Sequence, residues 1–212
     1  MRGVGICLVL VAALSTGCTQ EKPVPNPTPS IPSVVATALP EGWSRCVNHA
    51  QGWSIGYPGA WFTTDAFTDP LTGRVDREPT SACKLFDPEK FVIPRYSEFP
   101  TTALEIGRTK IRFDRAIRYA TDPVNYRTIL RETWVVMGLP ALRLEVEALG
   151  LGLTLKGTHR YGWVIDLGAQ GTFSVFAVGP PDVPLDRYRV YRAFADRALA
   201  TLEIPSAGVP PS

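Results

Sequence analysis

The sequence lacks a strong charge of either sign. Its 212 residues carry 22 Lys and Arg against 20 Asp and Glu, which leaves a formal net charge of +2. A balance this even gives no long-range attraction to nucleic acid, so we expect no nucleic-acid partner. Tandem repeats are absent as well, and 45% hydrophobic residues is an ordinary globular composition.

Long apolar runs are also missing. The run from Val4 to Leu14 is too short to span a bilayer as a helix, and no second apolar span follows. A single basic residue, Arg2, precedes this run, and small residues lead from it to Cys18. That three-part pattern is typical of a secretory signal peptide, which we assign to residues 1–17.

Metal-ligand spacings are the third absence. Acidic residues are scattered, and none stands in the Asp-x-Asp-x-Asp-Gly spacing of a calcium loop. The scattered acids include Asp65, Asp69, Asp76, Glu78, Asp87 and Glu89. Paired acids for glycosidase chemistry can come from distant positions, so that possibility stays open. We expect no cofactor.

The end of the predicted signal peptide is informative in itself. Leu14-Ser15-Thr16-Gly17-Cys18 resembles a bacterial lipobox, although Ser15 stands where Leu is commonest. This motif predicts that Cys18 is lipidated and becomes the first residue of the mature chain. The chain would then be anchored by lipid to the cell membrane on the extracytoplasmic side, or in the periplasm if there are two membranes. The alternative is an ordinary cleaved signal with an incidental cysteine.

A Pro-rich stretch follows the lipobox. Residues 18–41 are rich in Pro, Ser and Thr and nearly uncharged after Lys22. Such a segment buries no core and predicts a semi-rigid tether that rises about 3.1 Å per residue. A tether of this kind holds a domain about 50 Å from a bilayer. The order of lipid, tether and domain is that of a surface lipoprotein.

Cysteine is scarce, with four residues in the chain. Cys7 leaves with the signal peptide and Cys18 takes the lipid, so Cys46 and Cys83 remain. In an oxidising compartment this pair predicts one disulfide. Two free thiols are one alternative. The other is a metal site begun by the C-x-x-H spacing of Cys46 and His49, which has no second close-spaced pair.

Residues 42–205 have the length of one domain with a hydrophobic core, and residues 206–212 form a loose tail. Alternating or β-rich runs predict strands over residues 53–57, 103–108, 133–137, 141–148, 158–167 and 172–178. Gly138-Leu139-Pro140 is expected to be the turn between two of them. Because such short turns join antiparallel neighbours, we expect a central antiparallel sheet.

Two segments have helical periodicity. Residues 113–121 form a short helix ended by Asp122-Pro123, and residues 186–202 form a longer one with an apolar stripe. The stripe is expected to face the core. The fold class is therefore α+β, a central antiparallel sheet covered by helices.

Gly52-Trp53-Ser54-Ile55-Gly56 fits the Gly-x-Ser-x-Gly pattern of esterase nucleophiles. A nucleophile elbow requires a buried strand before the serine and a helix directly after it. Here the preceding residues are polar and turn-like, and Tyr57-Pro58-Gly59 cannot start a helix. The downstream His159 lies in an alternating run. We therefore expect Ser54 to be an ordinary strand residue.

The same stretch, read as GWSIGYPGAW from Gly52 to Trp61, resembles the opening hairpin of the PsbP-like superfamily. In that hairpin a strand ends at Tyr-Pro, and a following tryptophan folds back onto the core. Residues 135–141 (VVMGLPA) resemble the central hairpin of the same group. The resemblance covers most of residues 52–204 and implies an α/β/α sandwich. Members of this group include a photosystem II extrinsic subunit, a nuclear import factor and many bacterial lipoproteins, and most of known function bind proteins.

The densest basic patch comes late in a predicted strand. Arg108, Lys110 and Arg112 alternate with other residues and would share one face, and Arg115 follows on the helix. For a lipid-anchored domain this patch predicts contact with anionic headgroups. The alternative is a solvated face paired with neighbouring acids.

We expect a non-enzymatic lipoprotein that binds a protein of the cell envelope. A binder or carrier of a small apolar or lipid ligand is the alternative, and an enzyme is the third. The turn-rich segment of residues 62–100, which contains Cys83, is where we expect binding specificity, because loops on a rigid sheet usually hold it.

Overall fold

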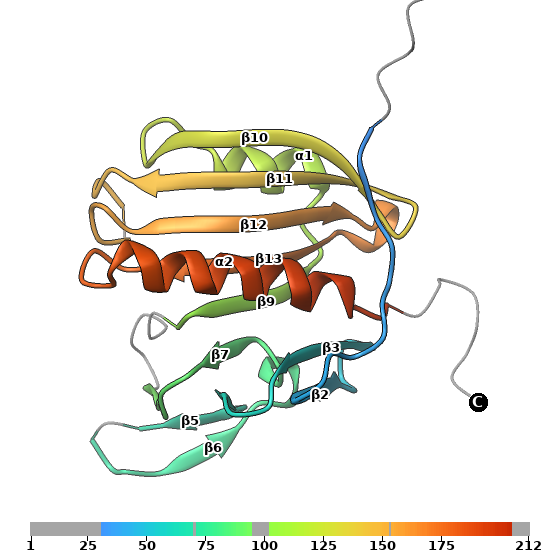
Figure 1. Cartoon of the computed structure of the whole chain (residues 1–212). Coiled ribbons are helices and arrows are strands. Elements are labelled where there is room, and N and C mark those ends of the chain that lie inside the picture. The colour runs from blue at the N-terminus through green and yellow to red at the C-terminus, as the bar shows by residue number, and fades with distance from the viewer. Residues whose placement is uncertain (1–30, 70, 95–101, 153, 205–212) are drawn as a thin grey trace, which may run out of the picture. The chain divides into compact units, whose positions relative to one another are not determined.

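The computed structural model describes residues 31–69, 71–94, 102–152 and 154–204, which form a mixed α+β fold dominated by strands (Figure 1). The main sheet has eight strands. In spatial order they are β1 (Ser33–Val34), β10 (Tyr126–Val136), β11 (Leu139–Ala148), β12 (His159–Asp166), β13 (Thr172–Gly179), β9 (Leu104–Thr109), β7 (Leu85–Asp87) and β4 (Phe62–Thr63).

The long strands β10 to β13 form an antiparallel meander that continues into β9. Met137 and Gly138, with φ of 50° and 79°, make the turn between β10 and β11. Two successive positive φ values are those of a type I′ hairpin turn, which matches the twist of the flanking strands. The expected turn at Gly138–Pro140 is therefore wrong in position, because Leu139 and Pro140 already belong to β11.

The start of the described chain adds the one parallel pair of the main sheet. β1 pairs in parallel with the end of β10, so the sheet is mixed rather than purely antiparallel. Further along, the Thr37 N–H donates to the carbonyl of Ala200 at 2.7 Å. Residues 31–41, expected to be the end of the tether, thus contact the domain. The rest of the tether, the signal peptide and the tail at 206–212 lie outside the described residues.

Smaller elements lie beside β9 and β7. β2 (Trp43–Asn48) and β3 (Trp53–Pro58) pair as a hairpin. A second small sheet has the order β6-β5-β8, from β6 (Val75–Arg77), β5 (Ala66–Thr68) and β8 (Ile93–Pro94). Two short 3-10 turns, η1 (Pro79–Ser81) and η2 (Gly168–Gln170), complete the set.

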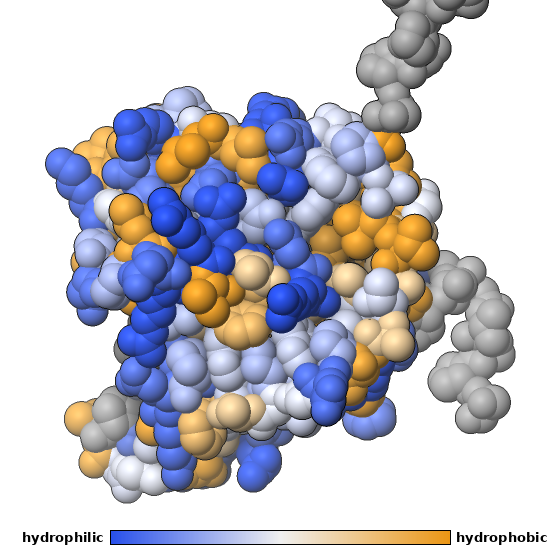
Figure 2. Space-filling model, in the orientation of Figure 1, coloured by the Kyte–Doolittle hydropathy of each residue, from blue (hydrophilic) through white to orange (hydrophobic). Residues whose placement is uncertain are grey.

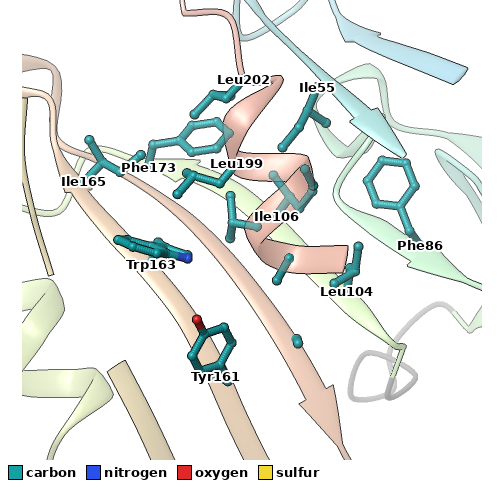
Figure 3. Close-up of a cluster of buried hydrophobic side chains, with 14 of the residues drawn as sticks. Ile55, Phe86, Leu104, Ile106, Tyr161, Trp163, Ile165, Phe173, Leu199 and Leu202 are labelled. Atoms are coloured by element: carbon teal, nitrogen blue, oxygen red, sulfur yellow. The ribbon is translucent and has the colours of Figure 1, made fainter. Parts of the chain in front are cut away.

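The helix α2 (Leu185–Ala200) packs against one face of the main sheet. Its apolar stripe is buried with side chains of β9, β12 and β13, as Figure 3 shows for Leu199 and Leu202 beside Ile106 and Phe173. Burying a Leu or Phe side chain stabilises the fold by about 1.5–3 kcal/mol each. The expectation that this stripe faces the core is confirmed. Trp61 also folds back, with its ring 5.0 Å from that of Phe194.

The helix α1 (Phe113–Ala120) contacts the alternate set of strand residues. Its Ile117 is buried in a cluster with Leu142, Leu144, Val164 and Phe176. Since successive strand residues point to opposite faces, α1 and α2 lie on different faces of the sheet. Both expected helices are present within two residues of their predicted bounds.

A polar network lies between α2 and the strands. The Tyr161 hydroxyl and the Trp163 indole N–H each donate to Asp196, both at 2.8 Å. Arg192 pairs with the buried Glu145 at 3.1 Å. Burial raises the pKa of Tyr161, and the negative charge of Asp196 raises it further.

Ser54 lies inside β3, as expected from its context. Its hydroxyl donates to Glu203 at 2.8 Å and accepts from Arg45 at 3.0 Å. Arg45 in turn pairs with Glu203 at 2.8 Å. These contacts tie the hairpin to the end of the domain, and the hydroxyl has no histidine partner among its described contacts.

Candidate functional site

The disulfide between Cys46 and Cys83 joins the β2–β3 hairpin to the segment before β7. The prediction of this disulfide is confirmed, and the two sulfurs are therefore not free to ligate a metal. Among the described residues no three His, Cys, Asp or Glu side chains gather closely enough to hold a metal ion.

Cys83 also turns the chain. Its φ of 63° is in the left-handed region, which non-glycine residues rarely adopt. After this turn, β7 pairs with β9 only at Leu85–Glu105 and Phe86–Leu104, and the Ile106 N–H donates to the carbonyl of Lys84 at 2.7 Å. Beyond Ile106 no described strand pairs with β9 on this side.

A hollow of about 320 Å³ lies beside this unpaired end of β9. Part of its lining is apolar and comes from β9, β13 and the wall formed by β7 and β8. These apolar residues are Leu85, Ile93, Ile106 and Phe176. Gly107 lies among them, and a Cβ atom added to it would meet no atom within 4 Å. The middle of the hollow is therefore bare backbone.

A second hollow, of about 520 Å³, adjoins the first and shares Arg108 and Thr109 with it. It is bounded by Gln51 of the β2–β3 turn, Gln170 of η2, and Lys110. We call the two hollows together the β9 groove. They follow the last residues of β9 and the turn after it.

The charges of the β9 groove are predominantly positive. Arg160 pairs with Glu105 at 2.6 Å, and its guanidinium lies 4.8 Å from the centre of the Phe176 ring. The three other cations of the lining, Lys84, Arg108 and Lys110, form no ion pair among the described residues. Such uncompensated cations attract anions.

Arg108 illustrates how this positive charge is held in place. Its guanidinium donates to the carbonyl of Gln51 at 2.9 Å and to the Oε1 of Gln170 at 2.6 Å. Both acceptors are neutral, so they orient the cation without neutralising it. The side chain is half-buried, which reduces screening by solvent.

The expected basic patch is only partly assembled. Arg108 and Lys110 lie in the β9 groove, whereas Arg112 pairs with Asp114 at 3.4 Å and Arg115 donates to the Tyr119 hydroxyl at 2.6 Å. β9 ends at Thr109, and Arg112 is the N-cap of α1. The expectation that Arg108, Lys110 and Arg112 share one face of a strand is therefore wrong. Their contact with anionic headgroups stays a prediction.

Two cations of the groove were not singled out from the sequence. Arg160 lies in the alternating run of β12, and Lys84 follows Cys83 directly. The position of Lys84 next to the disulfide is a local signal for its place in the wall. The segment of residues 62–94, in its described part, supplies that wall, although it contains short strands rather than plain loop.

The proposed lipidation site, Cys18, lies outside the described residues. Within the part of the chain that is described, no helix has the length and hydropathy needed to cross a membrane.

Comparison with known proteins gives a single kind of similarity. No protein-family model matches the chain, and no curated protein matches it. Solved structures similar to it include the solution structure of cyanobacterial PsbP (CyanoP) from Synechocystis sp. PCC 6803. The identity is 13%, the TM-score is 0.39, and the match covers 77% of this chain and 92% of that one. That protein carries the name of the group that the sequence resembles, and nothing further about this chain is inferred from it.

Proposed function

We propose that the chain is a non-enzymatic, lipid-anchored lipoprotein on the extracytoplasmic side of the cell membrane, where it acts as a protein-binding module of the envelope. The lipobox and the Pro-rich stretch support the anchor and the tether. We infer also that its fold is a complete α/β/α sandwich, because α1 and α2 pack on different faces of the main sheet.

The observation that supports protein binding best is the β9 groove. It combines an unpaired strand end with three cations that have no anionic partner among the described residues. The disulfide at Cys83 lies two residues before β7 and restrains the start of the wall, which favours a groove formed before a partner arrives. Preorganised surfaces of this kind lose little conformational freedom on binding.

The test is crosslinking of the full chain in cells, followed by affinity capture and mass spectrometry. We expect one stoichiometric envelope protein. The double variant Lys84→Glu and Lys110→Glu should lose it, because two of the three unpaired cations of the groove are reversed in charge. Lys156→Glu changes an exposed cation elsewhere and is the matched control. Equal capture by the unaltered chain, the double variant and Lys156→Glu would exclude the groove as the binding site. Capture of no protein would refute the proposed function.

A carrier of a small apolar or lipid ligand is the second candidate. The 320 Å³ hollow favours it, because ligand sites begin at about 300 Å³ and are mostly apolar in lining. Mass spectrometry of the chain purified under native conditions distinguishes the two functions. A bound small molecule that is absent from Gly107→Leu, in which a side chain fills the hollow, would support the carrier.

A further inference from the structure

We propose that the β9 groove takes an extended acidic segment of the partner, which adds to β9 as a further strand along Gly107–Thr109. This inference rests on the proposed protein-binding function and names the chemistry of its partner. It follows from the backbone, the lining and the charges of the groove, and from the contrast with the opposite edge of the main sheet.

Among the described residues, the backbone of β9 has unpaired groups at this place. The Ile106 N–H points away from β13, since it donates to the carbonyl of Lys84. Successive residues of a strand direct their N–H and C=O groups to alternate sides, so the groups of Arg108 point to the same side as those of Ile106. β7 has already left β9 there. A strand added next to Arg108 continues the ladder that β7 begins.

The hollow offers space and apolar contacts for the side chains of such a strand. Gly107 and Thr109 share one face of β9, and over Gly107 the hollow is open. An added strand directs alternate side chains into the same space, where Leu85, Ile93 and Phe176 supply apolar contacts. Main-chain hydrogen bonds with pockets for alternate side chains are the usual form of peptide addition to a sheet edge.

The charges select an acidic segment. Lys84 lies at one end of the unpaired stretch and Lys110 at the other, with Arg108 between them. Glu105, the acid of the first hollow, already pairs with Arg160. Carboxylates on the added strand would meet these cations, whereas a basic segment would be repelled.

The opposite edge of the main sheet shows the protections that β9 lacks. β10 has an irregularity between Thr128 and Leu130, exposed arginines at Arg127 and Arg131, and β1 over its last residues. Bulges, charges and short covering strands are common means of preventing addition to an edge. At β9 the cations Lys84, Arg108 and Lys110 border a hollow that has room for a further strand. Positive charge there attracts an acidic segment instead of preventing addition.

The test uses the full chain with Cys18→Ala, labelled with ¹⁵N, and three acetylated and amidated hexapeptides. The probe is Glu-Val-Glu-Val-Glu-Val. One control has Lys in place of Glu, and the other is the acidic peptide methylated at every peptide nitrogen. We expect the acidic probe alone to slow hydrogen exchange at the Arg108 amide, by at least about tenfold at saturation.

Two variants of the chain sharpen the test. Gly107→Val projects a side chain into the hollow, where its Cβ atom meets nothing within 4 Å, and it should weaken binding of the acidic peptide at least about tenfold. Thr133→Val places the same side chain on β10 and should leave binding unchanged. Thermal unfolding of both variants shows whether they keep the fold.

Three results would overturn the proposal. One is an Arg108 amide that stays unprotected with the acidic peptide. Another is equal binding of the methylated peptide, which leaves only attraction between charges. The third is slowed exchange at the Arg108 amide when oleate is added in place of the peptide, with no change when the peptide is added. That result would make the groove a site for a small ligand. If envelope capture nevertheless persists and depends on Lys84 and Lys110, the protein-binding function stands without strand addition.

Discussion

At the scale of single residues, Asp196 is central to the contact between α2 and the sheet. It lies on α2 and accepts hydrogen bonds from two buried aromatic residues, Tyr161 and Trp163. A buried donor that loses its acceptor costs about 1–3 kcal/mol, because neither protein nor water replaces the lost bond. Sequence periodicity located the helix but gave no sign of this pairing, since the partners are far apart in the chain.

We predict that Asp196→Ala lowers the free energy of unfolding by about 2–4 kcal/mol, as two buried donors lose their acceptor. Urea unfolding followed by circular dichroism measures the change. Arg189→Ala on the exposed side of α2 is the control and should change stability by less than about 0.5 kcal/mol. Equal stability of the two variants would contradict the assigned role of Asp196.

Two buried tyrosines give the fold a dependence on alkaline pH. Burial raises the pKa of Tyr161 and of Tyr188, and the nearby charges of Asp196 and Glu145, respectively, raise them further. The ordinary tyrosine value is 10.0. Above that pH the unfolded chain releases protons that the folded chain retains, so the contribution of these two tyrosines to stability is constant below about pH 10 and falls as the pH rises.

The expected slope is about 1.4 kcal/mol per pH unit for each tyrosine above pH 10. Urea unfolding at pH 9, 10 and 11 measures it. Tyr188→Phe should reduce the slope by the contribution of one tyrosine, about 1.4 kcal/mol per pH unit. A slope that does not change in this variant would show that Tyr188 is not one of the groups responsible.

At the scale of elements, the sequence predicts β11, β12, β13 and both helices well, but of β10 (Tyr126–Val136) it predicts only the end, from Thr133. β11, β12 and β13 alternate over eight or more residues, and α2 has a long apolar stripe. The short strands of residues 62–94 escape prediction, because strands of two or three residues have no measurable period. Their position depends on pairing with distant strands and on the disulfide.

The candidate site shows the same division. Arg108 and Lys110 could be singled out as a basic pair, but the groove beside them depends on where β7 leaves β9. That departure coincides with the left-handed turn at Cys83, which is bonded to Cys46. No local pattern encodes it. The disulfide could be predicted from the cysteine count. The unpaired end of β9 beside it could not.

We predict that the double variant Cys46→Ser and Cys83→Ser lowers the free energy of unfolding by about 4 kcal/mol, in the chain-entropy account of a 37-residue separation. Hydrogen exchange at the amides of Leu85 and Phe86 should become faster than in the unaltered chain. The amides of β11 should still rank in the same order of exchange rate. Hydrogen exchange by NMR tests this. Unchanged exchange at Leu85 would show that the wall of the groove does not depend on the disulfide.

At the scale of the whole molecule, the start of the described chain changes the expected reach of the tether. Residues 31–41 contact the domain through β1 and Thr37, so the predicted free tether shortens to residues 18–30. At about 3.1 Å per residue, these 13 residues would reach roughly 40 Å. With the proposed lipid anchor, the domain would stay within that distance of the membrane surface.

The anchor itself gives the last prediction. Cys18→Ala should release the chain from membranes, because the predicted lipid is lost. Cell fractionation with detection of the chain measures the release, and the intact mass of the membrane form reports the lipid. The control is Cys7→Ala, which removes a cysteine of the predicted signal peptide, and this variant should remain membrane-bound. If Cys18→Ala stays in the membrane fraction under high salt, the chain is held there by something other than lipid on Cys18.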